Sequence, residues 1–275
     1  MPVNVVSATL RGGLFTKVVG KRLIFFQEIP STMDEASRLA QEGADEGTVV
    51  VAGTQTAGRG RQGRNWLSRQ GNLYLSIIFR PTLEVLPMLS ILAGVAAVRA
   101  IRKTTRLEPG IKWPNDIMLG GKKTGGILVE SVVQGDQVSH AILGIGLNVG
   151  LDAQNEGEIA NLATSLNEAA GNLEAGRTVP PEDLLRQLLH DLDNLYVQAT
   201  HGGSPLPEWE ALLETLGQPI HATWRNEVFT GLAEGIDNLG NLQLRLEDGQ
   251  LMTLTAGDVS LNSRAAGAAT QSHTP

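Results

Sequence analysis

The hydrophobic pattern of the chain changes at Gln218, and this change most limits the folds open to it. Before Gln218, short β-branched runs alternate with longer segments whose apolar residues recur with a helical period. After it, only short apolar runs separated by turn residues remain, at 220–224, 228–236, 242–246 and 251–255. Short strands joined by turns in this way are typical of a small barrel. We therefore expect an α+β domain followed by a small C-terminal β-barrel.

The expected α+β domain combines a mixed, α/β-type sheet with flanking helices. Strands are predicted at 23–27, 48–52, 73–79, 117–119, 127–133 and 138–149, and helices at 32–40, 86–105, 161–170, 181–197 and 207–216. The first helix should begin at a capping box, because Thr32 is followed three residues later by Glu35. A tight hairpin turn is predicted at the paired glycines 120–121. Residues 22–216 should form this domain and residues 217–262 the β domain.

The two ends of the chain are predicted to lie outside these domains. Residues 1–21 form an N-terminal extension without a strong periodic pattern, and we expect part of it to lack fixed structure. Residues 263–275 are rich in Ala, Ser, Thr and Gly, a composition typical of a disordered tail. The start of the chain does not show the basic, apolar and small-residue pattern of a secretory signal peptide.

Charge and cysteine content narrow the classes of function. The chain carries 22 basic and 29 acidic residues, a net charge of -7, whereas nucleic-acid-binding domains are usually basic. It has no cysteine, which excludes disulfides, thiolate metal sites and a cysteine nucleophile. The longest apolar stretch, 83–100, is interrupted by Glu84, Pro87 and Arg99, so it predicts a core helix and not a membrane span. We expect a cytoplasmic protein.

A glycine- and arginine-rich segment, 58–66 (GRGRQGRNW), is the strongest candidate for a binding site. It places three arginines in a chain that is acidic overall. Glycine permits close approach of the backbone to a ligand, and guanidinium groups bind phosphate or carboxylate through paired hydrogen bonds. Trp66 adds an aromatic ring that can stack on a planar base or pack the loop down. The segment therefore predicts a mobile loop that closes over an anionic small molecule.

Two other interpretations of this segment follow from the residues alone. One is a solvated basic surface loop, since runs of charge usually face water. The other is a dinucleotide-binding fingerprint, since Gly58, Gly60 and Gly63 match its glycine spacing. That fingerprint opens a helix, whereas residues 64–71 have no helical apolar period and lead to another strand. The local sequence therefore disfavours dinucleotide binding and leaves the surface loop as the alternative.

A second candidate region spans 112–126. Pro114 is expected to end a strand where Asn115 and Asp116 emerge, and these side chains can orient a nucleophile or hold a metal-bound phosphate. A turn-forming Asn–Asp pair is the alternative. Lys123 lies at the predicted hairpin just before two glycines and can act as a point charge on a phosphate or carboxylate. An exposed hairpin lysine is the alternative for that residue.

Five motifs, in this order, resemble the biotin–protein ligase family. They are 31–32 (ST), 55–66 (QTAGRGRQGRNW), 112–116 (KWPND), 123–130 (KTGGILVE) and 144–148 (GIGLN). The resemblance covers residues 23–150, and the C-terminal β domain is similar to the family's small SH3-like domain. Five separate motifs in the right order are far more specific than any one of them.

The resemblance implies a two-step ligase reaction. Biotin and ATP with Mg2+ first give biotinyl-5′-AMP and pyrophosphate, and a lysine of a biotin carboxyl carrier protein or domain then displaces AMP. A closing loop suits this chemistry, because the intermediate carries a phosphate and is sensitive to water. The implied partners are biotin, ATP and the carrier domain of a biotin-dependent carboxylase, without a tightly bound cofactor. A homodimer is among the implied assemblies, since relatives are often dimers.

The resemblance also assigns site residues motif by motif. Lys123, Arg61 and Asp116 are the implied catalytic residues, with Lys123 on the biotin carboxylate or the α-phosphate and Asp116 orienting the incoming lysine. The metal ligands stay unassigned, because Mg2+ arrives on the ATP phosphates. The implied biotin and adenylate contacts are Ser31, Thr32, Met33, Gln55, Arg59, Gly60, Arg61, Trp66, Asn115, Lys123, Gly126 and Asn148.

These contacts have different implied roles. Ser31, Thr32 and Gln55 should hydrogen-bond the ureido ring of biotin. The arginines of the 58–66 segment should wrap biotin and the adenylate phosphate, with Trp66 beside the adenine or supporting the loop. Gly126 should leave room for the fused rings of biotin.

The chain departs from the family pattern in two ways. The family often has Asn after the Ser-Thr pair, where this chain has Met33, so a backbone contact can persist there but a side-chain amide contact cannot. Some relatives carry an N-terminal helix-turn-helix domain and repress transcription, whereas here only residues 1–21 precede the catalytic pattern. We therefore expect no DNA binding.

Two alternative functions are compatible with parts of the sequence. A lipoate–protein ligase or octanoyltransferase would share the catalytic fold, although the GRGR and KWPND motifs and the β domain together favour biotin. A nucleic-acid-binding module would use Arg59, Arg61 and Arg64 and would bind any polynucleotide with strong salt dependence. The acidic balance of the chain disfavours this last alternative.

Overall fold

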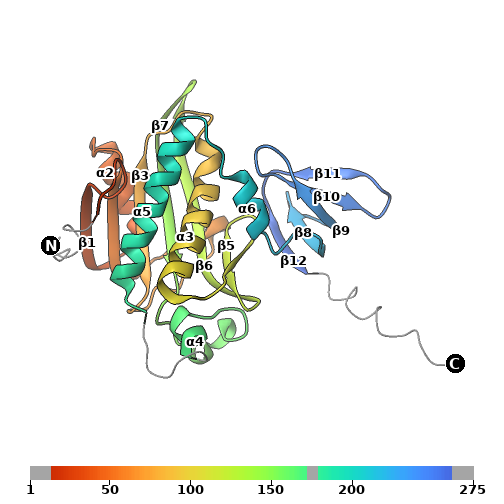
Figure 1. Cartoon of the computed structure of the whole chain (residues 1–275), viewed down its shortest axis with the longest axis horizontal. Coiled ribbons are helices and arrows are strands. Elements are labelled where there is room, and N and C mark those ends of the chain that lie inside the picture. Colours follow the sequence, from red (N-terminus) through yellow and green to blue (C-terminus); the bar gives the residue numbers. More distant parts are fainter. Residues whose placement is uncertain (1–13, 172–178, 262–275) are drawn as a thin grey trace. The chain divides into compact units, whose positions relative to one another are not determined.

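The computed structural model of the chain (Figure 1) describes residues 14–171 and 179–261. The chain falls into two compact units. The larger unit comprises Met1–Gly110 and Asn115–Pro205, and the smaller comprises Ile111–Pro114 and Leu206–Pro275. The predicted disordered tail, 263–275, and the first thirteen residues of the predicted N-terminal extension lie outside the described residues.

Six strands of a seven-stranded mixed sheet form the centre of the larger unit, and two of the three residues of the seventh strand, β4, belong to the segment 111–114 of the smaller unit. In spatial order the strands of this sheet are β1 (Arg22–Ile29), β2 (Thr48–Gln55), β3 (Leu73–Phe79), β7 (Gln137–Leu147), β6 (Lys122–Gln134), β5 (Asp116–Leu119) and β4 (Gly110–Lys112). β1 and β2 run parallel, whereas β2–β3, β3–β7, β7–β6 and β6–β5 are antiparallel. The predicted α+β class with a mixed sheet is confirmed.

The predicted hairpin turn at the paired glycines joins β5 to β6. Gly120 and Gly121 both adopt positive φ, at 58° and 76°, which is the backbone of a two-residue type I′ turn. Glycine is favoured there because it carries no Cβ to clash. This tight turn places Lys123 of β6 beside Asp116 of β5, although the two residues are seven positions apart.

Helices cover both faces of the sheet (Figure 1). Neighbouring residues of β3 demonstrate this, because successive side chains of a strand point to opposite faces. Ile78 belongs to the same core cluster as Met33 of α2 (Thr32–Gln41). Phe79 instead packs its ring against Tyr196 of α5 (Pro181–Thr200), with centroids 4.6 Å apart. The sheet is therefore buried between α2 on one face and α5, which packs with α3, on the other.

The helices differ from the sequence predictions at their bounds: α3 and α4 begin later than predicted, α5 ends three residues later, and α6 (Leu206–Leu212) ends four residues earlier. α3 spans Leu89–Thr105 after a 3-10 turn at Leu86–Met88, and α4 spans Leu166–Gly171. The predicted capping box at the start of α2 is wrong by one residue. Ser31 is the N-cap, and its hydroxyl accepts from the Asp34 N–H at 3.5 Å. Thr32 lies inside the helix, which leaves its hydroxyl free for a different partner.

Residues 17–19 of the predicted N-terminal extension are held in place by α5, which agrees with the expectation that only part of the extension lacks fixed structure. The carboxylate of Asp193 on α5, 2% exposed, accepts from the N–H groups of Lys17, Val18 and Val19 at 2.7, 2.7 and 2.8 Å. Charge-assisted bonds of this kind are among the stronger ones in proteins. Gly47 lets the segment pack closely, since a Cβ there would lie 1.9 Å from the Val18 carbonyl oxygen.

The smaller unit contains α6 (Leu206–Leu212) and a five-stranded antiparallel sheet. Its strand order is β11 (Leu251–Leu254), β10 (Leu242–Leu246), β9 (Glu227–Ile236), β8 (Pro219–Trp224) and β12 (Asp258–Leu261). The predicted all-β module is thus confirmed, and β12 is a strand that the sequence did not indicate. Among the described residues, β11 and β12 pair on one side only, so a closed barrel is not seen.

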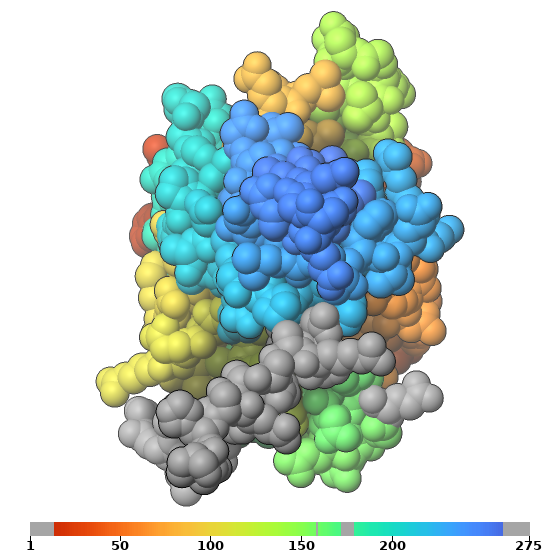
Figure 2. Space-filling model, turned by 90° about the vertical axis from the view of Figure 1, so that its right-hand side faces the viewer, coloured from red at the N-terminus to blue at the C-terminus, as the bar shows by residue number. Residues whose placement is uncertain are grey.

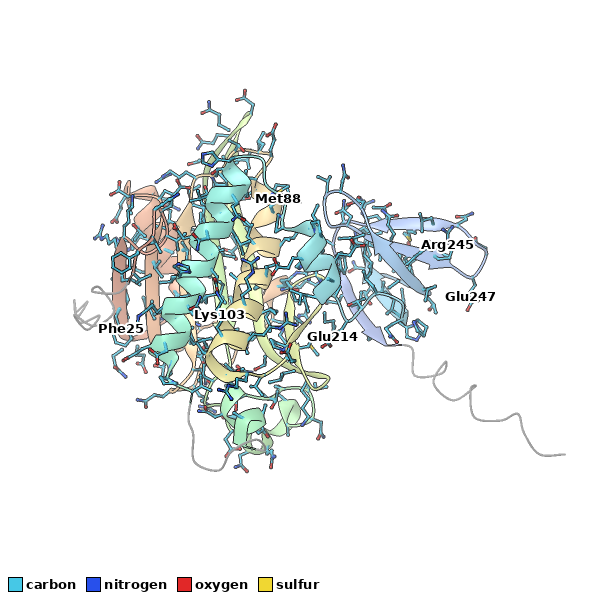
Figure 3. The ribbon with its side chains drawn as sticks, viewed as in Figure 1. Phe25, Met88, Lys103, Glu214, Arg245 and Glu247 are labelled. Atoms are coloured by element: carbon cyan, nitrogen blue, oxygen red, sulfur yellow. The ribbon has the colours of Figure 1, made fainter. Side chains whose placement is uncertain are left out.

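Ion pairs link elements within each unit, and Figure 3 labels one partner of two such pairs, Lys103 and Arg245. In the larger unit, Lys103 of α3 forms an ion pair with Asp191 of α5 at 2.7 Å. In the smaller unit, Arg245 of β10 pairs with Glu234 of β9 at 2.6 Å. In Figure 2 the described residues of the C-terminal part of that unit are coloured blue. No helix within 14–171 or 179–261 has both the length and the apolar character needed to cross a bilayer.

Candidate active site

The glycine- and arginine-rich segment is a hairpin-like loop between β2 and β3; we call residues 58–66 the arginine loop. The Trp66 N–H donates to the Gly58 carbonyl at 2.9 Å and closes the neck of this loop. A 3-10 turn at Arg61–Gly63 forms its tip, and no α-helix follows it before β3. The loop therefore lacks the strand-to-helix geometry of a dinucleotide fingerprint.

Bonds across the arginine loop hold its backbone. The Gly60 N–H donates to the Arg64 carbonyl at 2.7 Å, and the Arg64 N–H donates to the Arg61 carbonyl at 3.1 Å. The guanidinium of Arg64 also donates to the Arg61 carbonyl, at 3.4 Å. Gly60 and Arg64 thus contribute to the fold of the loop itself.

Two loop arginines reach side chains of other elements. Arg59 pairs with Asp34 of α2 at 2.7 Å and with Glu130 of β6 at 3.1 Å. Arg61 donates to the Asn115 side-chain oxygen at 3.0 Å. The segment is therefore anchored to three distant parts of the larger unit, unlike the freely solvated surface run that was the alternative interpretation.

Asn115 and the pair Lys123–Asp116 lie where β5 and β6 meet. The Asn115 amide nitrogen donates to the Ile127 carbonyl at 2.5 Å, which fixes the side chain with its oxygen toward the arginine loop. The Lys123 ammonium lies 2.6 Å from an Asp116 carboxylate oxygen, and both side chains are partly exposed. The Asn–Asp pair is thus more than a turn, and Lys123 is not a freely exposed hairpin lysine.

The indole of Trp66 lies on β6 and β7 over two glycines. A Cβ on Gly146 would lie 2.7 Å from two atoms of that ring, and a Cβ on Gly126 would lie 3.0 Å from a third. The Lys123 ammonium sits over the indole, 5.3 Å from the ring centroid, within cation–π range. In this structure Gly126 therefore makes room for Trp66. The indole N–H is buried and has no hydrogen-bond partner among the described residues.

Thr32 and Gln55 form the polar part of the site on the sheet. The Thr32 N–H and hydroxyl both donate to the Gln55 side-chain oxygen, at 2.8 and 3.0 Å. Two serines that the sequence reasoning missed extend this pair: Ser76 donates to the Thr32 hydroxyl, and Ser68 accepts from the Gln55 amide. Ser68 lies only two residues beyond Trp66, but nothing in its local sequence indicates a partner.

The structure also shows where three further predicted biotin or adenylate contacts lie. Ser31 is buried at the helix N-cap. Met33 lies in the core, with its sulfur so close to Gly144 that a Cβ there would clash at 2.5 Å. The buried Asn148 amide donates to the Thr164 carbonyl at 3.1 Å. The structure thus joins most predicted residues in one region but turns the Met33 side chain into the hydrophobic core.

Comparisons with known proteins agree with this geometry. Residues 25–148 match the model of the "Biotin/lipoate A/B protein ligase family", and residues 215–262 match the "Biotin protein ligase C terminal domain". The "Bifunctional ligase/repressor BirA" of Bacillus subtilis is 38% identical over 266 residues, which cover 94% of this chain and 80% of that protein. The chain belongs to the biotin protein ligase family.

Other members of the biotin protein ligase family support this placement. The "Biotin--[acetyl-CoA-carboxylase] ligase" of Paracoccus denitrificans is 37% identical over 78% of this chain and 90% of its own length. The solved "Biotin protein ligase from Aquifex aeolicus in complex with biotin and ATP" has a TM-score of 0.74 and 29% identity, and covers 88% of this chain and 99% of that one. Every candidate residue, from Ser31 to Asn148, lies inside the matched range 25–148.

Proposed function

We infer that this protein is an ATP-dependent biotin–protein ligase. It activates biotin as biotinyl-5′-AMP with release of pyrophosphate, and then transfers the biotinyl group to a lysine of a carrier domain. The observation that carries this conclusion is the convergence of the arginine loop, Lys123, Asp116, Thr32 and Gln55 in one region of a biotin protein ligase family member. Arg61 there contacts Asn115, and Lys123 contacts Asp116 and the Trp66 ring.

The cationic groups suit the first step. A biotin carboxylate oxygen attacks the α-phosphorus of ATP, the bond between the α-phosphorus and its bridging oxygen breaks, and pyrophosphate leaves. Negative charge is concentrated on the phosphoryl oxygens during this exchange, so preorganised cations lower its barrier. We assign this role to Lys123, Arg59 and Arg61. Mg2+ enters with ATP as part of the substrate.

The ion pair Lys123–Asp116 suits both steps. Partly exposed pairs contribute little to stability, so exchanging this contact for a substrate phosphate costs little. When Lys123 turns to the phosphate, Asp116 is left with a free carboxylate. We assign to Asp116 the orientation of the incoming carrier lysine and acceptance of its proton. The amine forms a C–N bond with the biotinyl carbonyl, the C–O bond to AMP breaks, and AMP leaves.

The polar pair Thr32–Gln55 suits the ureido ring of biotin. A cyclic urea presents one carbonyl acceptor and two N–H donors, and an amide next to a hydroxyl offers the complementary groups. We assign this ring to Thr32, Gln55 and the N-cap Ser31. The Trp66 indole N–H is buried without a hydrogen-bond partner in the part of the chain that the structure describes, and this costs free energy. We expect ligand binding to be accompanied by a change in the arginine loop that gives this N–H a partner.

We further propose that the smaller unit is an SH3-like module and that the acceptor is a biotin carboxyl carrier protein or domain. The match of residues 215–262 to the C-terminal domain model supports the first proposal. The name of the Paracoccus denitrificans relative, which specifies the ligase of acetyl-CoA carboxylase, supports the second.

The test of this function is exchange of labelled pyrophosphate into ATP with each candidate acid. We expect exchange that depends on biotin and MgATP and that is absent with lipoate or octanoate. Exchange supported by lipoate and not by biotin would establish the alternative acyl ligase instead. The second step is tested by adding a purified carrier domain, with its acceptor lysine changed to arginine as the matched control.

A further inference from the structure

A chain of hydrogen bonds runs from the sheet to the neck of the arginine loop. The Ser76 hydroxyl donates to the Thr32 hydroxyl at 2.8 Å, and Thr32 donates to the Gln55 oxygen at 3.0 Å. The Gln55 amide nitrogen donates to the Ser68 hydroxyl at 2.9 Å, and Ser68 donates to the Trp66 carbonyl at 3.2 Å. The two serines at its ends are buried. This series of hydrogen bonds therefore connects the proposed ureido site to the Trp66 backbone at the neck of the arginine loop.

The direction of these bonds is fixed by groups that can only donate. The Thr32 backbone N–H has no lone pair to offer, so the atom of Gln55 that faces it must be the amide oxygen. The amide nitrogen of Gln55 therefore points to Ser68. Because the Ser68 oxygen accepts from that nitrogen, its proton is free for the Trp66 carbonyl. Ser68 is thus the partner that holds the amide nitrogen of Gln55 in place.

The Ser68 hydroxyl also lies close to the neck of the arginine loop. A Cβ on Gly58 would lie 2.6 Å from the Ser68 hydroxyl oxygen, 2.6 Å from the Trp66 carbonyl and 3.1 Å from the Gln55 nitrogen. Gly58 and Trp66 are the two residues whose backbone bond closes the neck. Ser68 therefore lies against both strands of the neck and also bonds the Gln55 amide.

We propose that Ser68 is a positioning residue, which orients the Gln55 amide toward the ureido ring and couples that amide to closure of the arginine loop. This inference rests on the proposed ligase function. Without the Ser68 hydroxyl, the amide of Gln55 loses the partner of its nitrogen and can rotate. The Trp66 carbonyl at the neck loses a donor at the same time. Two effects therefore follow together: weaker biotin binding and a loop that retains the adenylate less well.

The test compares Ser68→Ala with a control variant at Ser76, at the opposite end of the same series of hydrogen bonds. Ser76→Ala removes a hydroxyl that contacts Thr32 but not the loop. For each purified full-length variant, pyrophosphate exchange gives KM for biotin and kcat. Release of labelled biotinyl-adenylate from the preformed complex gives the off-rate, and thermal unfolding gives Tm.

We expect Ser68→Ala to raise KM for biotin about tenfold, to change kcat less than about threefold, and to speed adenylate release about fivefold or more. Ser76→Ala should raise KM by a smaller factor and leave adenylate release at the wild-type rate. Ser68→Thr, which retains the hydroxyl, should restore both values. Ser68→Cys, similar in size but a weak donor, should behave as Ser68→Ala and provides a second test if the alanine variant does not fold.

Three results would overturn the positioning role. A lowered Tm for Ser68→Ala with wild-type KM and release would show a merely structural hydroxyl. Equal acceleration of release by Ser76→Ala would show that coupling to the loop does not pass through Ser68. Failure of Ser68→Thr to restore KM would point to side-chain volume instead of the hydrogen bonds. Absence of biotin-dependent exchange in the wild type would refute the proposed function itself, and is distinguishable from all three.

Discussion

Replacing Lys123 by alanine is the substitution whose effect follows most directly from the site. Its ammonium lies 2.6 Å from Asp116 and 5.3 Å from the centroid of the Trp66 ring. In the first step this charge would act on the biotin carboxylate or the α-phosphate. Losing a charge-assisted contact in a closed site costs about 2–4 kcal/mol, which corresponds to a fall of roughly thirty- to a thousandfold in rate.

A second effect of this substitution should also slow adenylate formation. Removal of Lys123 leaves the Asp116 carboxylate, only 20% exposed, without its partner. Two unit charges of the same sign about 4 Å apart repel by about 4 kcal/mol at an effective dielectric constant near 20. An unpaired Asp116 would therefore also oppose the binding of an anionic substrate. We expect Lys123→Ala to fall at the severe end of the range, and the double variant Lys123→Ala/Asp116→Asn to recover part of the loss in adenylate formation.

The assay is single-turnover formation of biotinyl-AMP, with Tm measured on the same preparations. The Lys123–Asp116 pair is partly exposed and should contribute about 0–1 kcal/mol to stability, so Tm should change little. Lys122→Ala is the matched control, since it removes the neighbouring lysine of the same hairpin and should leave the rate within about twofold. Wild-type adenylate formation by Lys123→Ala would refute this reasoning, as would equal losses in the two lysine variants.

Three further predictions concern the loop and the fold. Gly146→Ala should displace the Trp66 indole, because the added Cβ lies 2.7 Å from the ring. This should lower the free energy of unfolding by about 1–3 kcal/mol and speed adenylate release. An unchanged release rate would contradict the importance of this packing. Asp193→Ala should cost about 2–4 kcal/mol in denaturant unfolding, because three backbone N–H groups lose a charged acceptor, and a cost below about 0.5 kcal/mol would contradict that anchor. Burial, with a smaller effect from Arg80, lowers the pKa of His140, so the unfolded chain binds its proton more readily. The free energy of unfolding should therefore fall as the pH drops below the ordinary histidine pKa. Between about pH 7 and about pH 5, His140→Gln should lose less of this stability than the wild type. Equal losses in the two proteins would contradict the lowered pKa of His140.

The sequence predicts elements well where the signal is local. The strand at 73–79 coincides with β3 because its apolar run is bounded by turn residues on both sides. The β5–β6 hairpin is predicted because two adjacent glycines favour its turn. The cap of α2 was misplaced by one residue, since Ser31 and Thr32 carry equivalent hydroxyls and only the fold decides which one caps the helix.

Features that depend on distant partners could not be predicted in this way. Asp193 gives no sign in its helix that it holds residues 17–19, which lie about 175 positions away in the chain. Ser68 becomes part of the site only because β2 and the neck of the arginine loop bring Gln55 beside it. Met33 follows the Ser-Thr motif in sequence, but the turn of α2 directs its side chain into the core. Motifs therefore locate the site, whereas its connections come from tertiary packing.

The most direct test of the central claim is a competition between biotin and lipoate, the two acids named in the description of the matching family. The protein is incubated with MgATP, equal concentrations of biotin and lipoate, and a purified biotin carboxyl carrier domain, whose intact mass is then measured. We predict a single addition of one biotinyl group, absent when the acceptor lysine is changed to arginine. A lipoyl adduct, or an unmodified carrier domain alongside active wild-type protein in pyrophosphate exchange, would contradict the assignment as a biotin–protein ligase.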